Sequence, residues 1–193
     1  MKTPFLPALR MLLAMTALCG IAYPLAVTVA ARLWFADESG GSLVHFRGRA
    51  VGSRLLAQSF TNAACFQPRP SAAGHATMPS GAGNQGGTSA ALQASIAGRR
   101  TYWADGSARP VPPDLLTASG SGLDPHISPE AALFQLDRIA RARGLGRAQK
   151  EACEGLIRRH VEGPQFGILG ERRVNVLLLN LALDEYAGIR DER

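Results

Sequence analysis

A short polar segment holds the residue types that most suggest chemistry. Ser119, Gly120, Ser121 and Gly122 are followed at once by Leu123, Asp124, Pro125 and His126. Serine, aspartate and histidine form hydrolytic triads when they converge in space and the serine sits on a sharp strand-to-helix turn. Here no apolar strand directly precedes the serines and no Gly-x-Ser-x-Gly pattern occurs in the segment. We therefore predict no catalytic residues. The segment is either a Gly-Ser turn that leads into the N-cap Ser128, or a turn whose backbone N–H groups and following helix start contact an anion or a partner protein.

Two other patterns are candidates for binding sites. Residues 80–88 are glycine-rich but lack the Gly-Lys-Ser/Thr ending with which a P-loop holds phosphate and magnesium. The four histidines show no metal-ligand spacing, so no metal site is predicted. Two alternative functions stay open on the residues alone. One is a tethered extracytoplasmic hydrolase using Ser121, Asp124 and His126, and the other is a solute-binding domain using the loop 67–89.

An apolar N-terminal stretch precedes the domain that contains this segment and would determine where the domain is located. Residues 11–31 contain no charge, and Arg10 and Arg32 bracket them. As a helix they would reach about 31 Å, which matches the hydrocarbon core of a bilayer. The span is longer than the apolar region of a cleavable signal peptide, so we predict a permanent transmembrane helix in contact with lipid.

Two features inside this span have structural meaning. Pro24 lacks an N–H and crowds the carbonyl of Gly20, which predicts a kink. Ala22, Ala26 and Ala30 recur every four residues and form a small-residue stripe suited to a partner helix. The basic tail 1–10 is expected to stay in the cytoplasm, which leaves residues 32–193 as an extracytoplasmic domain.

The remaining residues predict an α+β domain. Apolar runs on either side of Arg47–Arg49 indicate a β-hairpin. A Pro/Gly/Ser-rich loop over 67–89 and a short helix over 90–100 should follow. Three helices are then expected. The first begins at Pro129 behind the N-cap Ser128, the second covers 147–161, and the third, a buried helix, covers 175–186 with Asn180 and Asp184 as its polar stripe.

The distribution of charged residues and the spacing of the cysteines exclude some classes of function and structure. The net charge is +6, but the arginines are scattered and aromatic residues make up 6% of the chain, so no nucleic-acid partner is predicted. Three widely spaced cysteines form no disulfide framework, although one bridge between Cys65 and Cys153 remains open. Because the domain is anchored and has no recognisable set of catalytic residues, we expect the chain to be a subunit of a larger complex.

Several long motifs in a fixed order resemble a known family. They match the C subunit of the Kdp high-affinity potassium-transporting P-type ATPase nearly from end to end. The chain departs from the usual family pattern at Ala57–Phe60 and Ser80–Asn84. The matching stretches are Tyr23–Leu25, Val51–Ser53 with Gln58 and Phe60, Arg69–Ala72, Thr117–Pro129, Arg173–Val176 and Leu179–Asp184.

The resemblance implies an accessory subunit of a bacterial cytoplasmic-membrane complex. Its partners there would be a channel-like subunit that selects potassium and a P-type subunit that hydrolyses ATP. The P-type phosphorylation motif Asp-Lys-Thr-Gly is absent from this chain, so the resemblance assigns ATP hydrolysis to the partner. The family is described as a catalytic chaperone that raises ATP affinity, with a glutamine at the position of Gln135 proposed to contact nucleotide. ATP is thus implied by resemblance alone, and an outside domain would more naturally cover the potassium entrance or brace the channel-like subunit.

Overall fold

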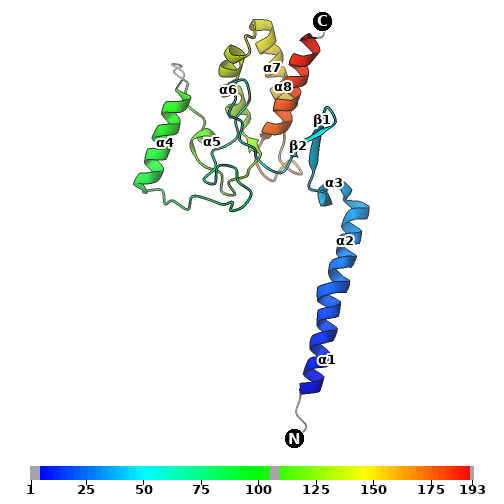
Figure 1. The fold of residues 1–193 in the computed structure, drawn as a ribbon. Helices are drawn as coiled ribbons and strands as arrows, with labels where there is room; N and C mark the ends of the chain where they lie inside the picture. Colours follow the sequence, from blue (N-terminus) through cyan, green and yellow to red (C-terminus); the bar gives the residue numbers. More distant parts are fainter. Residues whose placement is uncertain (1–4, 105–108, 192–193) are drawn as a thin grey trace. The chain divides into compact units, whose positions relative to one another are not determined.

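A computed structural model describes residues 5–104 and 109–191 of the chain (Figure 1). The chain divides near Leu43 into an N-terminal unit and a second unit that contains the rest. The predicted α+β class is confirmed: an apolar helix precedes a small domain with a hairpin, long loops and C-terminal helices. Residues 1–4 of the predicted tail lie outside the described part.

The N-terminal unit is built on a continuous helix that runs over Phe5–Trp34. Its parts are α1 (Phe5–Met15), a π-helical segment η1 (Thr16–Ala22) and α2 (Tyr23–Trp34). Among the described residues it is the one helix long and apolar enough to cross a membrane, and it extends the predicted span 11–31 at both ends. A four-residue helix, α3 (Ala36–Ser39), follows.

The π-helical segment lies directly before Pro24. The Tyr23 N–H donates to the carbonyl of Leu18, five residues back, as a π-turn requires. Because a proline ring clashes with the carbonyl four residues earlier, a wider turn at this point relieves the contact. The helix therefore departs from regular α-helical geometry before Pro24, and a kink there stays a prediction. In the stripe, Ala22 and Ala26 are exposed and Ala30 is half-buried, and its contact with a partner helix stays a prediction.

The predicted hairpin opens the second part of the chain. Strands β1 (Leu43–Phe46) and β2 (Arg49–Ser53) pair across a two-residue turn. Both turn residues have positive φ, 50° at Arg47 and 77° at Gly48, which is the type I′ geometry that matches the twist of paired strands. The sequence signal for the hairpin was thus local and sufficient.

The loop expected over 67–89 contains no regular helix or strand and ends at the N-cap Ser89. Its hydroxyl accepts from the Leu92 N–H and starts α4 (Ala90–Trp103), which is longer than the predicted 90–100. A short α5 (Pro113–Leu116) follows and packs against α4.

A small sheet and three helices form the rest. Strands β3 (His126–Ile127), β5 (Arg173–Asn175) and β4 (Val161–Glu162) lie antiparallel in that spatial order. Helices α6 (Pro129–Ala142), α7 (Arg147–Arg159) and α8 (Val176–Asp191) pack side by side (Figure 1). Helix α7 ends before Val161, which belongs to β4, and α8 begins one residue later and runs five residues further than predicted.

The core lies between α6, α7, α8 and the sheet. Its fully buried members include Leu136, Ile139, Ile157, Val174 and Leu179. Complete burial of a side chain of this size contributes about 1.5–3 kcal/mol. The nearly continuous apolar surface of the third predicted helix is explained by this central position.

The cysteine pairing left open by the sequence is not formed. Cys65 and Cys153 are both free, and Cys153 is buried in the core on α7. Burial raises the pKa of the Cys153 thiol, so the sulfur stays protonated and behaves as a small apolar side chain.

Candidate functional site

Motifs that lie far apart in the sequence converge at the β3–β5 pair. His126 pairs with Asn175 and Ile127 with Val174, and the Val176 N–H donates to the Pro125 carbonyl at 2.9 Å. These contacts join the 117–129 motif to the 173–184 motif. The side-chain amide of Asn175 also donates to the carbonyl of Arg54, the residue after β2, at 2.8 Å.

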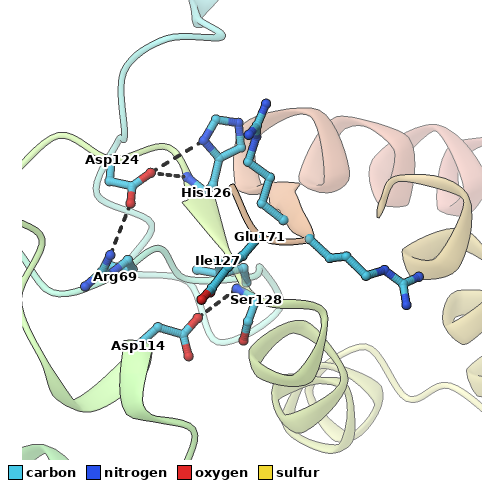
Figure 2. A pocket seen from close by; sticks show the side chains of 9 residues that line it. Arg69, Asp114, Asp124, His126, Ile127, Ser128 and Glu171 are labelled. Atoms are coloured by element: carbon cyan, nitrogen blue, oxygen red, sulfur yellow. Dashed lines mark hydrogen bonds and ion pairs between the residues drawn. The ribbon is translucent and has the colours of Figure 1, made fainter. Parts of the chain in front are cut away.

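A pocket with a cavity volume of about 220 Å³ opens at this junction (Figure 2). It is lined by three arginines, three carboxylates and a histidine, with Ile127 and Ser128 between them. The charged lining residues are Arg69, Asp114, Asp124, His126, Glu171, Arg172 and Arg173.

Asp124 connects several of these groups. Its carboxylate accepts from the His126 backbone N–H at 3.0 Å, lies 3.5 Å from His126 Nδ1, and pairs with Arg69 at 3.3 Å (Figure 2). Burial raises the pKa of Asp124, but the hydrogen bonds from His126 and the charge of Arg69 together lower it below the ordinary value. The carboxylate is therefore negative at neutral pH and anchors this side of the pocket.

The lowered pKa of Asp124 predicts a specific acid sensitivity. A carboxyl that binds its proton less tightly when folded stabilises the fold above its unfolded pKa, and that contribution is lost as the pH falls through the lower folded value. We expect Asp124→Asn to flatten the dependence of Tm on pH below about pH 4, where an unfolded aspartate titrates. Circular dichroism melts of the full chain in detergent from pH 2 to 7 would measure it. An unchanged slope would contradict the assignment.

The serine-rich turn before Asp124 is internally satisfied. The buried Ser119 hydroxyl accepts from the N–H groups of Gly122 and Asp124, at 3.1 and 3.4 Å. The Ser121 hydroxyl accepts from Leu123 at 3.1 Å. Most of the amides that were expected to contact an anion are thus occupied, and Gly120 and Ser121 form the exposed outer surface of the turn.

The structure brings only two members of the hydrolytic alternative together. Asp124 and His126 line the pocket, whereas Ser121 does not, and its oxygen lies 3.2 Å from the Ser119 hydroxyl. A serine held in its own turn lacks the hydrogen-bonded base that nucleophilic catalysis requires. The geometry therefore favours a structural role for Ser121.

The loop 67–89 packs against this turn. The Ser119 N–H donates to the Pro70 carbonyl at 2.9 Å. Gly122 has a φ of +73°, and a Cβ there would meet the Gly81 carbonyl at 3.0 Å. Only glycine allows both this backbone conformation and this close approach. The loop that was considered for solute binding thus supports the turn from one side.

Gln135, the residue implied in nucleotide contact, lies in the interior. Its side chain is fully buried on α6, and its amide forms a reciprocal pair with the backbone of Gln67. The Gln67 N–H donates to Oε1 at 2.8 Å, and Nε2 donates to the Gln67 carbonyl at 3.0 Å. A nucleotide could reach this amide only if the Gln67 segment left it.

Gln135 is one of several side chains that hold a single stretch of turn and loop, Ala63–Gln67, which we call the strapped segment. Asn180 on α8 binds the backbone of Phe66 in the same reciprocal way. Its side-chain oxygen accepts from the Phe66 N–H at 2.8 Å, and its amide donates to the Phe66 carbonyl at 3.0 Å. Every carbonyl of the strapped segment accepts from a side chain. The donors are Arg138 to Ala63 and Cys65, Arg143 to Ala64, Asn180 to Phe66 and Gln135 to Gln67.

The polar stripe Asn180–Asp184 is satisfied, as predicted, but by two separate partners. Asn180 binds Phe66, and Asp184 accepts from Arg143 at 2.6 Å. The pocket residues Asp114, Glu171 and Arg172 were missed by the sequence reasoning. Their only signal was proximity to motif residues, namely Arg173 and the Ser128 cap.

Among the described residues, no group of three His, Cys, Asp or Glu side chains is placed to hold a metal ion. The pocket lining contains as many arginines as carboxylates. Such a mixed lining suits recognition of a polar protein surface better than binding of a lone ion.

Comparison of the sequence with known proteins identifies the family. The family model described as "KdpC: K+-transporting ATPase, c chain" matches residues 5–185. The chain is 48% identical to the potassium-transporting ATPase KdpC subunit of Methylorubrum populi, over 97% of this chain and 99% of that one. It is 49% identical to the same subunit of Rhodospirillum rubrum, over 93% and 94%. The Methylococcus capsulatus subunit is 48% identical, over 93% and 96%. On the family match and these near-complete alignments, the chain belongs to the KdpC family, the c chains of K+-transporting ATPases.

Proposed function

We propose that this chain is a non-catalytic accessory subunit that docks beside the transport subunits of a potassium-uptake ATPase and stabilises the assembled complex. The observation that carries the proposal is that the polar groups of its motifs are hydrogen-bonded or paired with opposite charges within the chain. The longest motif, 117–129, forms an internally hydrogen-bonded turn and a charge-matched pocket. Such surfaces recognise proteins, because their charges fix orientation.

We propose that the helix Phe5–Trp34 anchors the subunit in the bacterial cytoplasmic membrane. The short basic tail lies inside and the domain lies outside, where it covers or braces the channel-like subunit that selects potassium. The support is the apolar length of the helix, with Arg10 and Arg32 at the two ends of its uncharged stretch 11–31.

An effect on ATP affinity would then be exerted through protein contacts with the ATP-hydrolysing subunit. Gln135 is fully buried and its amide is bonded to Gln67, which supports this indirect route over direct contact with nucleotide. A coupling of this kind needs only that the docked subunit favours one state of its partner.

The test is potassium-stimulated ATP hydrolysis by the purified complex with and without this chain. We expect omission to abolish the stimulated activity and re-addition to restore it. The Ser121→Ala chain should restore it as well, because the Ser121 hydroxyl acts only within its turn. Full activity without the chain would reject the accessory role, and failure of Ser121→Ala alone would revive the hydrolase alternative.

A further inference from the structure

An exposed apolar hairpin lies between β4 and β5. Its tip, Gln165–Leu169, carries Phe166 at 92%, Ile168 at 83% and Leu169 at 59% exposure. Isolated apolar residues are common on surfaces, but three large ones on a single short turn form a patch of the kind that marks interaction sites.

Backbone hydrogen bonds within the tip hold its shape. Gln165 and Leu169 exchange two backbone hydrogen bonds, of 2.8 and 2.9 Å. The Gly167 N–H donates to the Pro164 carbonyl at 3.1 Å, and Phe166 adopts a φ of +54°, which non-glycine residues rarely do. A turn fixed in this way presents its side chains in one arrangement, which lowers the ordering cost of binding.

The charges around the tip indicate what it contacts. From Val161 to Arg173, both included, the hairpin holds two acidic and two basic residues, and Glu162 pairs with Arg173 at 3.1 Å at its base. A loop that inserts into a lipid surface is typically flanked by an excess of Lys and Arg, which bind anionic headgroups. A balanced rim around an apolar tip instead fits a concave apolar site on a protein.

The tip is also continuous with the polar pocket. Glu171, Arg172 and Arg173 line the pocket and follow the tip directly in the chain. Interfaces commonly combine an apolar anchor with a charged rim in this way.

We propose that Phe166, Ile168 and Leu169 form the anchor by which this subunit docks into an apolar pocket on the extramembrane surface of a partner subunit of the same complex. This inference rests on the proposed accessory function and assigns its principal contact. Phe166, the most exposed member and the only aromatic one, enters deepest, and the charged pocket beside it sets the orientation.

The experiment places a photo-crosslinking phenylalanine analogue at position 166 of the full chain in the assembled complex, reconstituted in lipid nanodiscs. A covalent product with a partner subunit is expected. The same analogue at Met78, which is 89% exposed in the loop 67–89, serves as the control and should give none. A product only with lipid, a product with a second copy of this chain, or no product at position 166 would overturn the proposal.

A second arm measures retention of the subunit. The double variant Phe166→Ser/Ile168→Ser should lower co-purification with the complex by on the order of tenfold or more, as loss of an anchor does. Leu55→Ser, at a 56% exposed leucine, is the matched control and should be retained. The isolated variants should melt like the parent chain. If removing the whole chain abolishes ATPase stimulation while the double variant stays bound, the anchor is wrong and the accessory function stands.

Discussion

Asn180→Ala is expected to lower the melting temperature of the full chain by on the order of 10 °C, which corresponds to a loss of about 2–6 kcal/mol. The variant removes both hydrogen bonds to Phe66 and leaves an N–H and a carbonyl unsatisfied in the interior. Each such group costs about 1–3 kcal/mol. It also leaves a small cavity at a buried position of α8, which adds to the cost.

The melt can be followed by circular dichroism in detergent. Asn62→Ala is the matched control, because the variant removes one exposed hydrogen bond, from the Ala64 N–H to the side-chain oxygen Oδ1 of Asn62. That variant should stay within about 1 kcal/mol of the parent. Equal melting temperatures for Asn180→Ala and the parent would show that the strapped segment does not contribute to stability.

Gln135→Ala is expected to destabilise the chain by a similar amount in the complete absence of nucleotide. The Gln67 N–H and carbonyl lose their partners, and Arg138 loses a 2.8 Å bond to Oε1. Because these groups are buried or half-buried, about 2–5 kcal/mol should be lost. Gln93→Ala, which removes one exposed bond to Gly87, is the control and should change stability little.

This result separates two roles for Gln135. A residue that only contacted nucleotide would leave the melt of the nucleotide-free chain unchanged and would alter ATP affinity in the complex. A residue that positions the fold lowers the melting temperature first, and any change in ATP affinity follows from a loosened subunit. A parent-like melt combined with weakened ATP binding would refute the structural role.

Elements set by local rules were predictable from the sequence. The Ser128 cap with Pro129 fixed the start of α6, and the glycine turn at Gly48 marked the hairpin. Helix ends were less accurate, because Val161 and Asn175 belong to strands that are paired only in the tertiary fold.

The small sheet and the strapped segment could not be foreseen. Strands of two or three residues show no alternation of apolar and polar side chains. Gln135 reads as an ordinary helix residue, because its partner lies 68 positions earlier in the chain. Asn180 and Phe66 are 114 positions apart. Long-range pairing by side-chain amides leaves no periodic pattern in the sequence, so these contacts are defined only by the folded structure.

The strapped segment also explains how this chain avoids slippage. An ordinary strand can slide along its neighbour by two residues and find equivalent backbone partners. Ala63–Gln67 cannot, because its five carbonyls meet four side chains in a fixed order, and each side chain projects from a fixed position on or beside α6 or α8. Deleting one residue here would misalign the whole row at once. Insertions and deletions should therefore occur in the loop that follows Gln67. Family members are expected to differ in the length of this loop, because a change there leaves the interior undisturbed.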